Sequence, residues 1–289
     1  MIRRPVVANQ FYPGRAADCI AEIKEFLESP LPTSLPEKIV AGIVPHAGWT
    51  FSGQLAALVF AAIKKQNTKT DTFCVFGTAH RYFGVKPAVY DSGSWHTPLG
   101  EIKIDEELAQ ALLKTKSAVA DTDAHQGEHS IEVQVPLIQH LFPDAKLLPI
   151  ITPPGDEAIE LGNTIGDIIS ETKDKQIICI GSTDLTHYGP NYGFEPVGQG
   201  EAAFKWASDV NDRQFIDFAL TLEPQKMLDV AAQNFSACGP GAAAAAVAAA
   251  KKLGKTKGVL LAQTNSQKIM TTKFDSTSSD SVGYAAIIF

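Results

Sequence analysis

The chain has 289 residues, of which 45% are hydrophobic and 20% charged, so it can bury a large core and does not have the composition of a disordered protein. Its formal net charge of −7, without a cluster of lysines and arginines, argues against nucleic-acid binding. It contains no run of 18 apolar residues and no signal-peptide core after Met1, so we expect no membrane role.

The helices and strands that we expect alternate along the whole chain. In order, they are a helix over 16–28, a strand over 39–44, a helix over 52–66 with Ser52 as its N-cap, strands over 72–76 and 86–90, a short strand passing into a helix within 100–115, a helix over 129–142 that contains Pro136, strands over 146–151 and 177–180, an alanine-rich helix over 240–253, and strands over 258–263 and 284–289. No long polar linker divides this series. The alternation predicts an α/β fold, as a single layered domain over 1–289 with a central mixed or mostly parallel sheet flanked by helices.

The four cysteines are too few and too dispersed for a disulfide framework, and no two of them form a Cys-x-x-Cys pair. We therefore expect a reduced, cytoplasmic protein. Cys74 and Cys179 lie inside apolar runs, which indicates inert residues of the core.

Polar side chains follow three of the expected strands. His46 follows the strand at 39–44, His80 follows the strand at 72–76, and both Asp184 and His187 follow the strand at 177–180. Open α/β sheets build their sites beyond the strand ends, so we expect these groups to meet at one edge. Each histidine alone is better explained as a loop residue. Together they indicate a site, and imidazole and carboxylate are common ligands for Fe, Zn and Cu.

Cys238 adds a thiol to this group. It precedes Gly-Pro-Gly and the alanine-rich helix. A thiol just before a helix N-terminus lies at the positive end of the helix dipole, which favours the thiolate that binds metals or attacks electrophiles. The alternative is a small residue selected for a tight turn.

The stretch "DAHQGEHSIEVQVPL" contains a further cluster. His129 and Glu132 are three residues apart and would share one face of a helix, while His125 and Glu128 lie in the loop before it. We place His129 in the site. For Glu132, a negative charge at a helix N-terminus is the simpler interpretation.

Eight motifs, in the same order, resemble those of the Memo family, which is named for a mediator of cell motility. Prokaryotic members of this family are known as the B protein of the AmmeMemoRadiSam system. The motifs are "RPVVANQFYPG", "PHAGWTFSG", "GTAH", "TPLGEIKID", "EHSIEVQVPLI", "STDLTHYG", "CGPG" and "DSVGYAA". They extend over nearly the whole chain, and their order is more specific than any one of them.

The resemblance implies a metal site and a fold similar to the class III extradiol dioxygenases, which are non-heme iron enzymes. In Memo proteins the ligands are the histidine of "PHAG", the histidine that closes "GTAH" and the cysteine of "CG". These correspond here to His46, His80 and Cys238. The dioxygenases have a carboxylate where this chain has Cys238, so catechol cleavage does not carry over.

The resemblance also implies roles for other residues of the pocket. Asp184 and His187 would line it, with His187 as the acid/base group, oriented or assisted by Asp184. His129 resembles a histidine that lies near the bound oxygen in the dioxygenases.

The leading hypothesis is therefore a cytoplasmic, dioxygenase-like redox protein that binds Fe(II), with Cu or Zn as alternatives. Two other hypotheses stay open. One is a non-catalytic module that recognises a peptide or small metabolite through the metal and through Trp49, Phe51 and Tyr188; the other is a zinc hydrolase in which His187 or Asp184 activates water. The expected partner is a small-molecule or peptide ligand in the metal pocket, and the resemblance points to an association with a radical SAM protein and an AmmeMemoRadiSam A protein.

Overall fold

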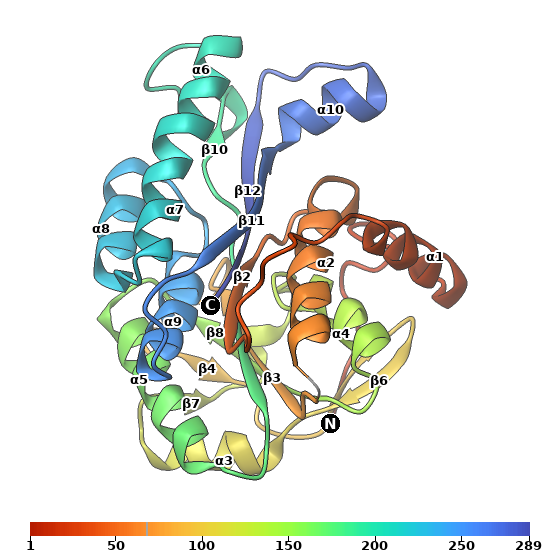
Figure 1. The fold of residues 1–289 in the computed structure, drawn as a ribbon, viewed down its shortest axis with the longest axis vertical. Coiled ribbons are helices and arrows are strands. Elements are labelled where there is room, and N and C mark those ends of the chain that lie inside the picture. Colours follow the sequence, from red (N-terminus) through yellow and green to blue (C-terminus); the bar gives the residue numbers. More distant parts are fainter. Residues whose placement is uncertain (68) are drawn as a thin grey trace.

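The strands form two sheets in the computed structural model, which describes residues 1–67 and 69–289 (Figure 1). The strands are β1 (Ile2–Arg3), β2 (Ala41–Val44), β3 (Thr72–Thr78), β4 (Ala88–Val89), β5 (Ser94–Thr97), β6 (Gly100–Lys103), β7 (Val119–Ala120), β8 (Lys146–Thr152), β9 (Ile177–Ser182), β10 (His187–Tyr188), β11 (Val259–Asn265) and β12 (Ser281–Ile288). Within the described residues, nine of them form a central sheet of order β10-β12-β2-β9-β3-β8-β4-β7, with β11 paired to β12. The other three form a small sheet of order β1-β5-β6.

Helices of three kinds connect and cover these strands. The α-helices are α1 (Ala16–Leu27), α2 (Trp49–Gln66), α3 (Glu106–Lys114), α4 (Val135–Leu141), α5 (Asp156–Glu171), α6 (Glu201–Trp206), α7 (Arg213–Leu220), α8 (Pro224–Asn234), α9 (Pro240–Lys252) and α10 (Ser266–Phe274). Three short 3-10 helices are η1 (Asp123–His125), η2 (Glu132–Gln134) and η3 (Pro190–Tyr192), and η4 (Ala207–Asp212) is a π-helix. In the described part of the chain, no helix combines the length and the apolar composition needed to cross a membrane.

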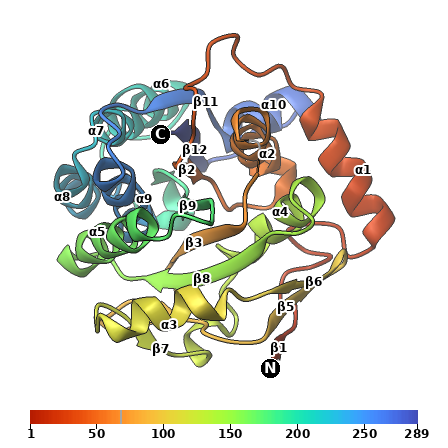
Figure 2. The same cartoon turned by 60° about the horizontal axis from the view of Figure 1, so that its bottom comes forward.

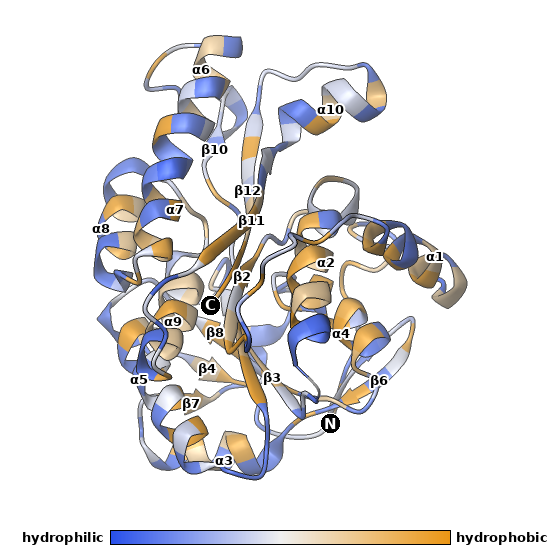
Figure 3. Ribbon diagram, viewed as in Figure 1, coloured by the Kyte–Doolittle hydropathy of each residue, from blue (hydrophilic) through white to orange (hydrophobic). Residues whose placement is uncertain are grey.

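The central sheet has a hydrophobic core on each face. Helices α1, α2 and α4 cover one face, and α3, α5, α7, α8 and α9 lie on the other (Figure 2). Side chains of β3 alternate between the two cores: Phe73 and Val75 belong to the first, and Cys74 and Phe76 to the second. Figure 3 shows hydrophobic residues along the central strands. This layered arrangement confirms the predicted α/β class and the predicted burial of Cys74.

The parallel strands place several polar residues at one edge of the sheet. Strands β2, β9, β3 and β8 run parallel, whereas β12 is antiparallel to β2, so the sheet is mixed with a parallel centre. His46, His80 and Asp184 each lie two residues beyond the end of a parallel strand. Carboxyl ends of parallel strands share one edge, which brings these residues together as predicted.

The alanine-rich helix α9 packs directly on the sheet. Every residue from Gly241 to Ala250 is buried. A Cβ atom at Gly181 of β9 would lie 2.6 Å from the carbonyl oxygen of Ala242 and 2.9 Å from the Cα atom of Ala243. This close approach, which small residues permit, brings the start of α9 and the preceding Cys238 to the same edge of the sheet.

Ser52 is not the N-cap that the sequence predicted. Helix α2 begins at Trp49 and has Gly48 at its N-cap position. Ser52 lies in the first turn, where its hydroxyl donates a hydrogen bond of 2.9 Å to the carbonyl oxygen of Ala47.

The helix predicted over 129–142 is shorter in the structure. Only η2 and α4 are helical in this stretch, so His129 precedes both of them. Pro136 lies in the first turn of α4, where its missing N–H costs no intrahelical hydrogen bond. His129 and Glu132 therefore do not share one face of a regular helix.

Candidate metal centre

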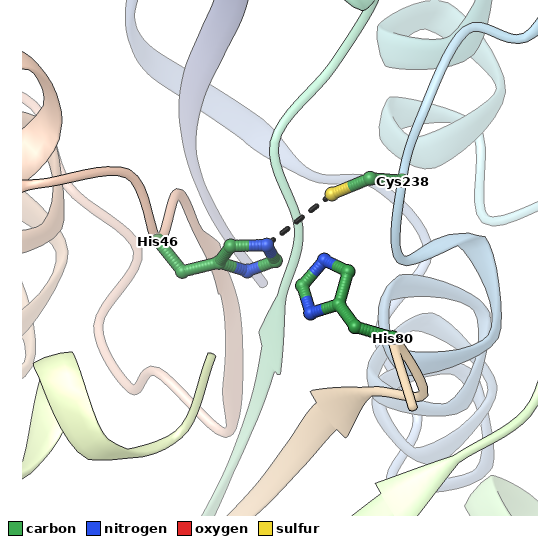
Figure 4. A group of neighbouring side chains, drawn as sticks. All are labelled: His46, His80 and Cys238. Atoms are coloured by element: carbon green, nitrogen blue, oxygen red, sulfur yellow. Dashed lines mark hydrogen bonds between the residues drawn. The ribbon is translucent and has the colours of Figure 1, made fainter. Parts of the chain in front are cut away.

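Three residues from distant parts of the chain bring two nitrogens and a sulfur together (Figure 4). One ligand atom from each of His46, His80 and Cys238 lies within 4.8 Å of the other two. The rings of His46 and His80 are nearly perpendicular, at 89°, with centroids 5.2 Å apart. The Sγ atom of Cys238 lies 3.2 Å from Nε2 of His46. Two imidazoles and a thiol are a donor set that suits Fe, Cu and Zn.

The hydrogen bonds of His46 fix which of its nitrogens can bind a metal. Its Nδ1 lies 3.0 Å from the Ser182 hydroxyl, which donates its own proton to the carbonyl oxygen of Ser130 over 2.7 Å. Nδ1 must therefore donate to Ser182, and Nε2 carries the lone pair that faces Cys238. Burial lowers the pKa of His46 well below its ordinary value, so the ring is neutral, as a metal ligand must be.

His80 is held by a carboxylate that the sequence did not mark as a site residue. Its Nδ1 lies 3.1 Å from both carboxylate oxygens of Glu128. Glu128 is 3% exposed. Burial alone would raise the pKa of Glu128, but hydrogen bonding and charge from His80, together with the backbone N–H of Ser130, lower it to about 2. The only signal in the sequence was the place of Glu128 in the loop before His129.

Without a bound metal, the surroundings of Cys238 favour the thiol over the thiolate that its place before a helix favours. Burial raises the pKa of this thiol, and the carboxyl of Asp184 adds to the effect. Burial thus outweighs the dipole of α9, and the thiol donates its proton toward His46. A bound cation would displace that proton. The backbone N–H of Cys238 also donates to the carbonyl oxygen of Asp184 over 3.2 Å, which ties the start of α9 to the end of β9.

Asp184 and His187 lie near the metal group, and one ligand atom from each of them lies within 4.8 Å of the other and of Cys238. The carboxylate of Asp184 accepts hydrogen bonds from the backbone N–H groups of His46 and the next residue, at 2.7 and 3.3 Å. Burial raises the pKa of Asp184 to about 7. The carbonyl oxygen of Leu185 lies 3.0 Å from Nδ1 of His187 and orients its ring. Because a carbonyl only accepts, Nδ1 of His187 carries the proton, and Nε2 has the lone pair.

His129 lies beside the candidate ligands, whereas Glu132 has a different environment. The ring of His129 stacks on His80 with centroids 4.9 Å apart and an angle of 6°. It meets the ring of Phe11 edge-on, at 4.7 Å and 63°. The carboxylate of Glu132 instead accepts hydrogen bonds from Arg3 and from the backbone of the N-terminal segment.

A cavity of about 520 Å³ joins these groups. In the described part of the chain, its polar lining includes His46, His80, His129, Asp184 and His187, but not Cys238. Four aromatic residues, Phe11, Phe51, Tyr192 and Tyr284, also line it.

Of the three aromatic residues that the sequence proposed for ligand binding, Phe51 lines the cavity. The other two are buried in the protein: Trp49 is 2% exposed and Tyr188 is 1% exposed. Their polar atoms donate to the carbonyl oxygens of Val133 and Gly198. The proposed ligand-binding role of Trp49 and Tyr188 is therefore wrong.

The fold and the site together define an α/β protein with a candidate metal group of two histidines and one cysteine at the carboxyl edge of its sheet. A family model described as "Memo-like protein" matches residues 3–288, and the chain belongs to this family. It is 37% identical over 299 residues to a MEMO1 family protein of Thermococcus onnurineus, covering 100% of this chain and 99% of that one. It is 38% identical over 294 residues to a MEMO1 family protein of Methanosarcina mazei, covering 99% and 98%.

One solved structure similar to this chain is the crystal structure of an uncharacterized protein from Escherichia coli K12. The match has a TM-score of 0.49 and 15% sequence identity, and it covers 85% of this chain and 99% of that one.

Proposed function

We propose that this Memo-like protein is a dioxygenase-like redox protein that holds Fe(II) through His46, His80 and Cys238. One observation carries the proposal: three ligand atoms from three separate segments lie within 4.8 Å of one another. The donor chemistry fits a metal, since the hydrogen bonds leave Nε2 of each histidine with its lone pair and the thiol has a proton to lose.

The residues around the ligands support chemistry on a molecule in the cavity. A bound metal of this kind supplies open coordination positions and a change of oxidation state. His187, held by Leu185, can take a proton from the molecule at its Nε2 and return it later. The ring of Tyr192 packs edge-on against His187, at 4.9 Å and 89°, and limits its rotation. His129 extends the polar wall beside His80.

The thiol at Cys238 limits the reaction that we propose. Two histidines and a carboxylate are the usual ligands of non-heme Fe(II) oxygenases, whereas a thiolate is softer and is itself oxidisable. We therefore propose redox chemistry without assigning catechol cleavage. Cu and Zn are the alternative metals, because both accept imidazole and thiolate ligands.

The cavity also supports a second candidate, a non-catalytic module for a small molecule or a peptide. Its aromatic residues and volume of about 520 Å³ are typical of ligand sites.

We propose a cytoplasmic location, which the four free cysteines favour. Association with a radical SAM protein and an AmmeMemoRadiSam A protein is a proposal that the family motifs support.

Anaerobic purification followed by metal analysis and oxygen-uptake assays tests this function. We expect about one iron per chain in the wild type and oxygen consumption when a substrate is found. The variants His46→Ala and His80→Ala should each lose most of the iron and stay folded, while His140→Ala, which changes a histidine of α4, should keep it. Stoichiometric iron in both ligand variants would contradict the assignment. Zinc with hydrolysis would favour a zinc hydrolase, and a retained metal without turnover would favour the binding module.

A further inference from the structure

A single buried carboxylate connects the loop after β3 with the loop before η2. Glu128 accepts hydrogen bonds from the backbone N–H groups of His129 and Ser130, both at 2.8 Å, through Oε1. Its Oε2 accepts from the backbone N–H of His80 at 3.3 Å. Both oxygens also lie 3.1 Å from Nδ1 of His80.

These contacts determine the proton on His80. A carboxylate that already accepts from three N–H groups has no proton to donate, so Nδ1 of His80 must be the donor. In the neutral ring, the form that binds a metal, Nε2 then keeps its lone pair, and it lies on the side of the ring where His46 and Cys238 converge (Figure 4). Without such a partner, neutral imidazole in water favours the opposite tautomer, in which Nε2 carries the proton and cannot bind a metal.

The two histidines are held by different partners. His46 is held by the neutral hydroxyl of Ser182, and His80 by the carboxylate of Glu128. We propose that Glu128 is a positioning residue that fixes the tautomer and ring orientation of His80 and so prepares its Nε2 for the metal. The proposal rests on the proposed metal-binding function and extends it to a residue outside the ligand set. Carboxylates that hold a ligand histidine in this way change metal affinity by about 10- to 100-fold.

Glu128→Gln separates positioning from loop support. The glutamine carbonyl can replace Oε1 and still accept from His129 and Ser130. Its NH₂ group then replaces Oε2, 3.1 Å from Nδ1 of His80, and presents a donor there. The carbonyl oxygen in the place of Oε1 also lies 3.1 Å from Nδ1 but already accepts from two backbone N–H groups, so we expect Nδ1 to accept from the NH₂ group and the proton to move to Nε2. The reverse placement of the amide would oppose two backbone N–H donors. The variant should therefore fold and carry the wrong tautomer at His80.

The direct measurement is a two-bond ¹H–¹⁵N correlation spectrum of the imidazole rings in protein prepared without metal, with His80 assigned through His80→Asn. We expect an unprotonated Nε2 at His80 in the wild type and a protonated Nε2 in Glu128→Gln. Co(II) and Fe(II) should bind the variant about 10- to 100-fold more weakly than the wild type.

Ser130→Ala is the matched control. It removes the hydrogen bond from the backbone N–H of Thr78 to the Ser130 hydroxyl, at 2.9 Å, and so weakens the same loop without touching His80. Its His80 spectrum should equal that of the wild type. If the His80 signals change as much in Ser130→Ala as in Glu128→Gln, Glu128 only supports the loop and does not position His80.

Two results would overturn the proposal: a protonated Nε2 at His80 in the wild type, or an unchanged tautomer and metal affinity in Glu128→Gln. The first needs no variant to fold. A wild type that binds no metal, with a tautomer that switches as expected, would contradict the proposed function and support the positioning of His80.

Discussion

The carboxylate of Glu132 binds the N-terminal segment, and substitution of Glu132 tests how much this contact stabilises the fold. Its side chain is 1% exposed in its ion pair with Nη1 of Arg3, at 2.7 Å. The same carboxylate accepts hydrogen bonds from the backbone N–H groups of Val6 and Val7, at 2.9 and 3.0 Å, and from the hydroxyl of Tyr12, at 3.1 Å. Glu132→Ala would remove the common acceptor of all four donors.

The expected loss of stability in Glu132→Ala follows from the charge of Arg3, which stays buried without its partner. Arg3 is 8% exposed, and its guanidinium keeps two carbonyl acceptors and the ring of Trp95, 4.1 Å away, but no anion. Removing one partner of a buried ion pair costs about 3–5 kcal/mol. Since domains are stable by about 5–15 kcal/mol, the variant should lose a large fraction of its free energy of unfolding.

Urea denaturation, followed by tryptophan fluorescence and circular dichroism, measures this loss. A double-mutant cycle with Arg3→Met isolates the ion pair, because the double variant leaves no buried charge from the pair unpaired. The folded fraction of Glu132→Ala should still bind iron, since Glu132 is not a candidate ligand. A loss below about 1 kcal/mol, well under the range for a broken buried pair, would refute this account of Glu132.

Two further predictions concern buried groups at and near the site. His187→Asn should keep its iron by metal analysis, while any turnover falls by about 10²–10⁴-fold, the usual effect of a positioned proton-transfer group; loss of the metal would make His187 a ligand instead. Burial raises the pKa of Asp212 from 3.8 to about 7, so folding favours its protonated form, and this stabilising contribution is present below pH 4 and lost as the pH rises through 7. A shift of one pH unit corresponds to about 1.4 kcal/mol, so the free energy of unfolding of Asp212→Asn should rise by up to about 4 kcal/mol relative to that of the wild type between pH 4 and 7. If the two proteins show the same dependence of unfolding free energy on pH, the assigned pKa is wrong.

Much of the site could be predicted because strand ends are visible in the sequence. Apolar runs stop shortly before His46, His80 and Asp184, and the parallel order of their strands brings these residues together. The packing of α9 was also predictable, since its alanines admit a close neighbour. Local pattern and sheet geometry were sufficient for these features.

The partners of the ligands could not be predicted in the same way. Glu128 lies 48 residues from His80, and Ser182 lies 136 residues from His46, so each pairing depends on how loops meet in three dimensions. The contact of His187 with the carbonyl oxygen of Leu185 could not be predicted either, because a backbone carbonyl has no sequence signature.

Two other differences arose from competition between local and tertiary effects. The position of Cys238 before a helix predicted a thiolate, but burial has the larger effect on its pKa. Between residues 190 and 235 the sequence predicted no helix, whereas α6, η4, α7 and α8 cover much of this stretch. The six-residue π-helix η4 interrupts the usual helical spacing between α6 and α7.

The most direct test of the proposed function is the metal content and visible spectrum of Cys238 variants after anaerobic loading with Fe(II) or Co(II). The wild type should bind one metal and, with Co(II), show a thiolate charge-transfer band. Cys238→Ser should lose the band and most of the metal, because a serine hydroxyl is much harder to deprotonate. Cys238→Asp should recover part of the Fe(II) by supplying an anionic oxygen. Full occupancy in Cys238→Ser, with a spectrum like that of the wild type, would contradict a metal centre built from two histidines and this thiol.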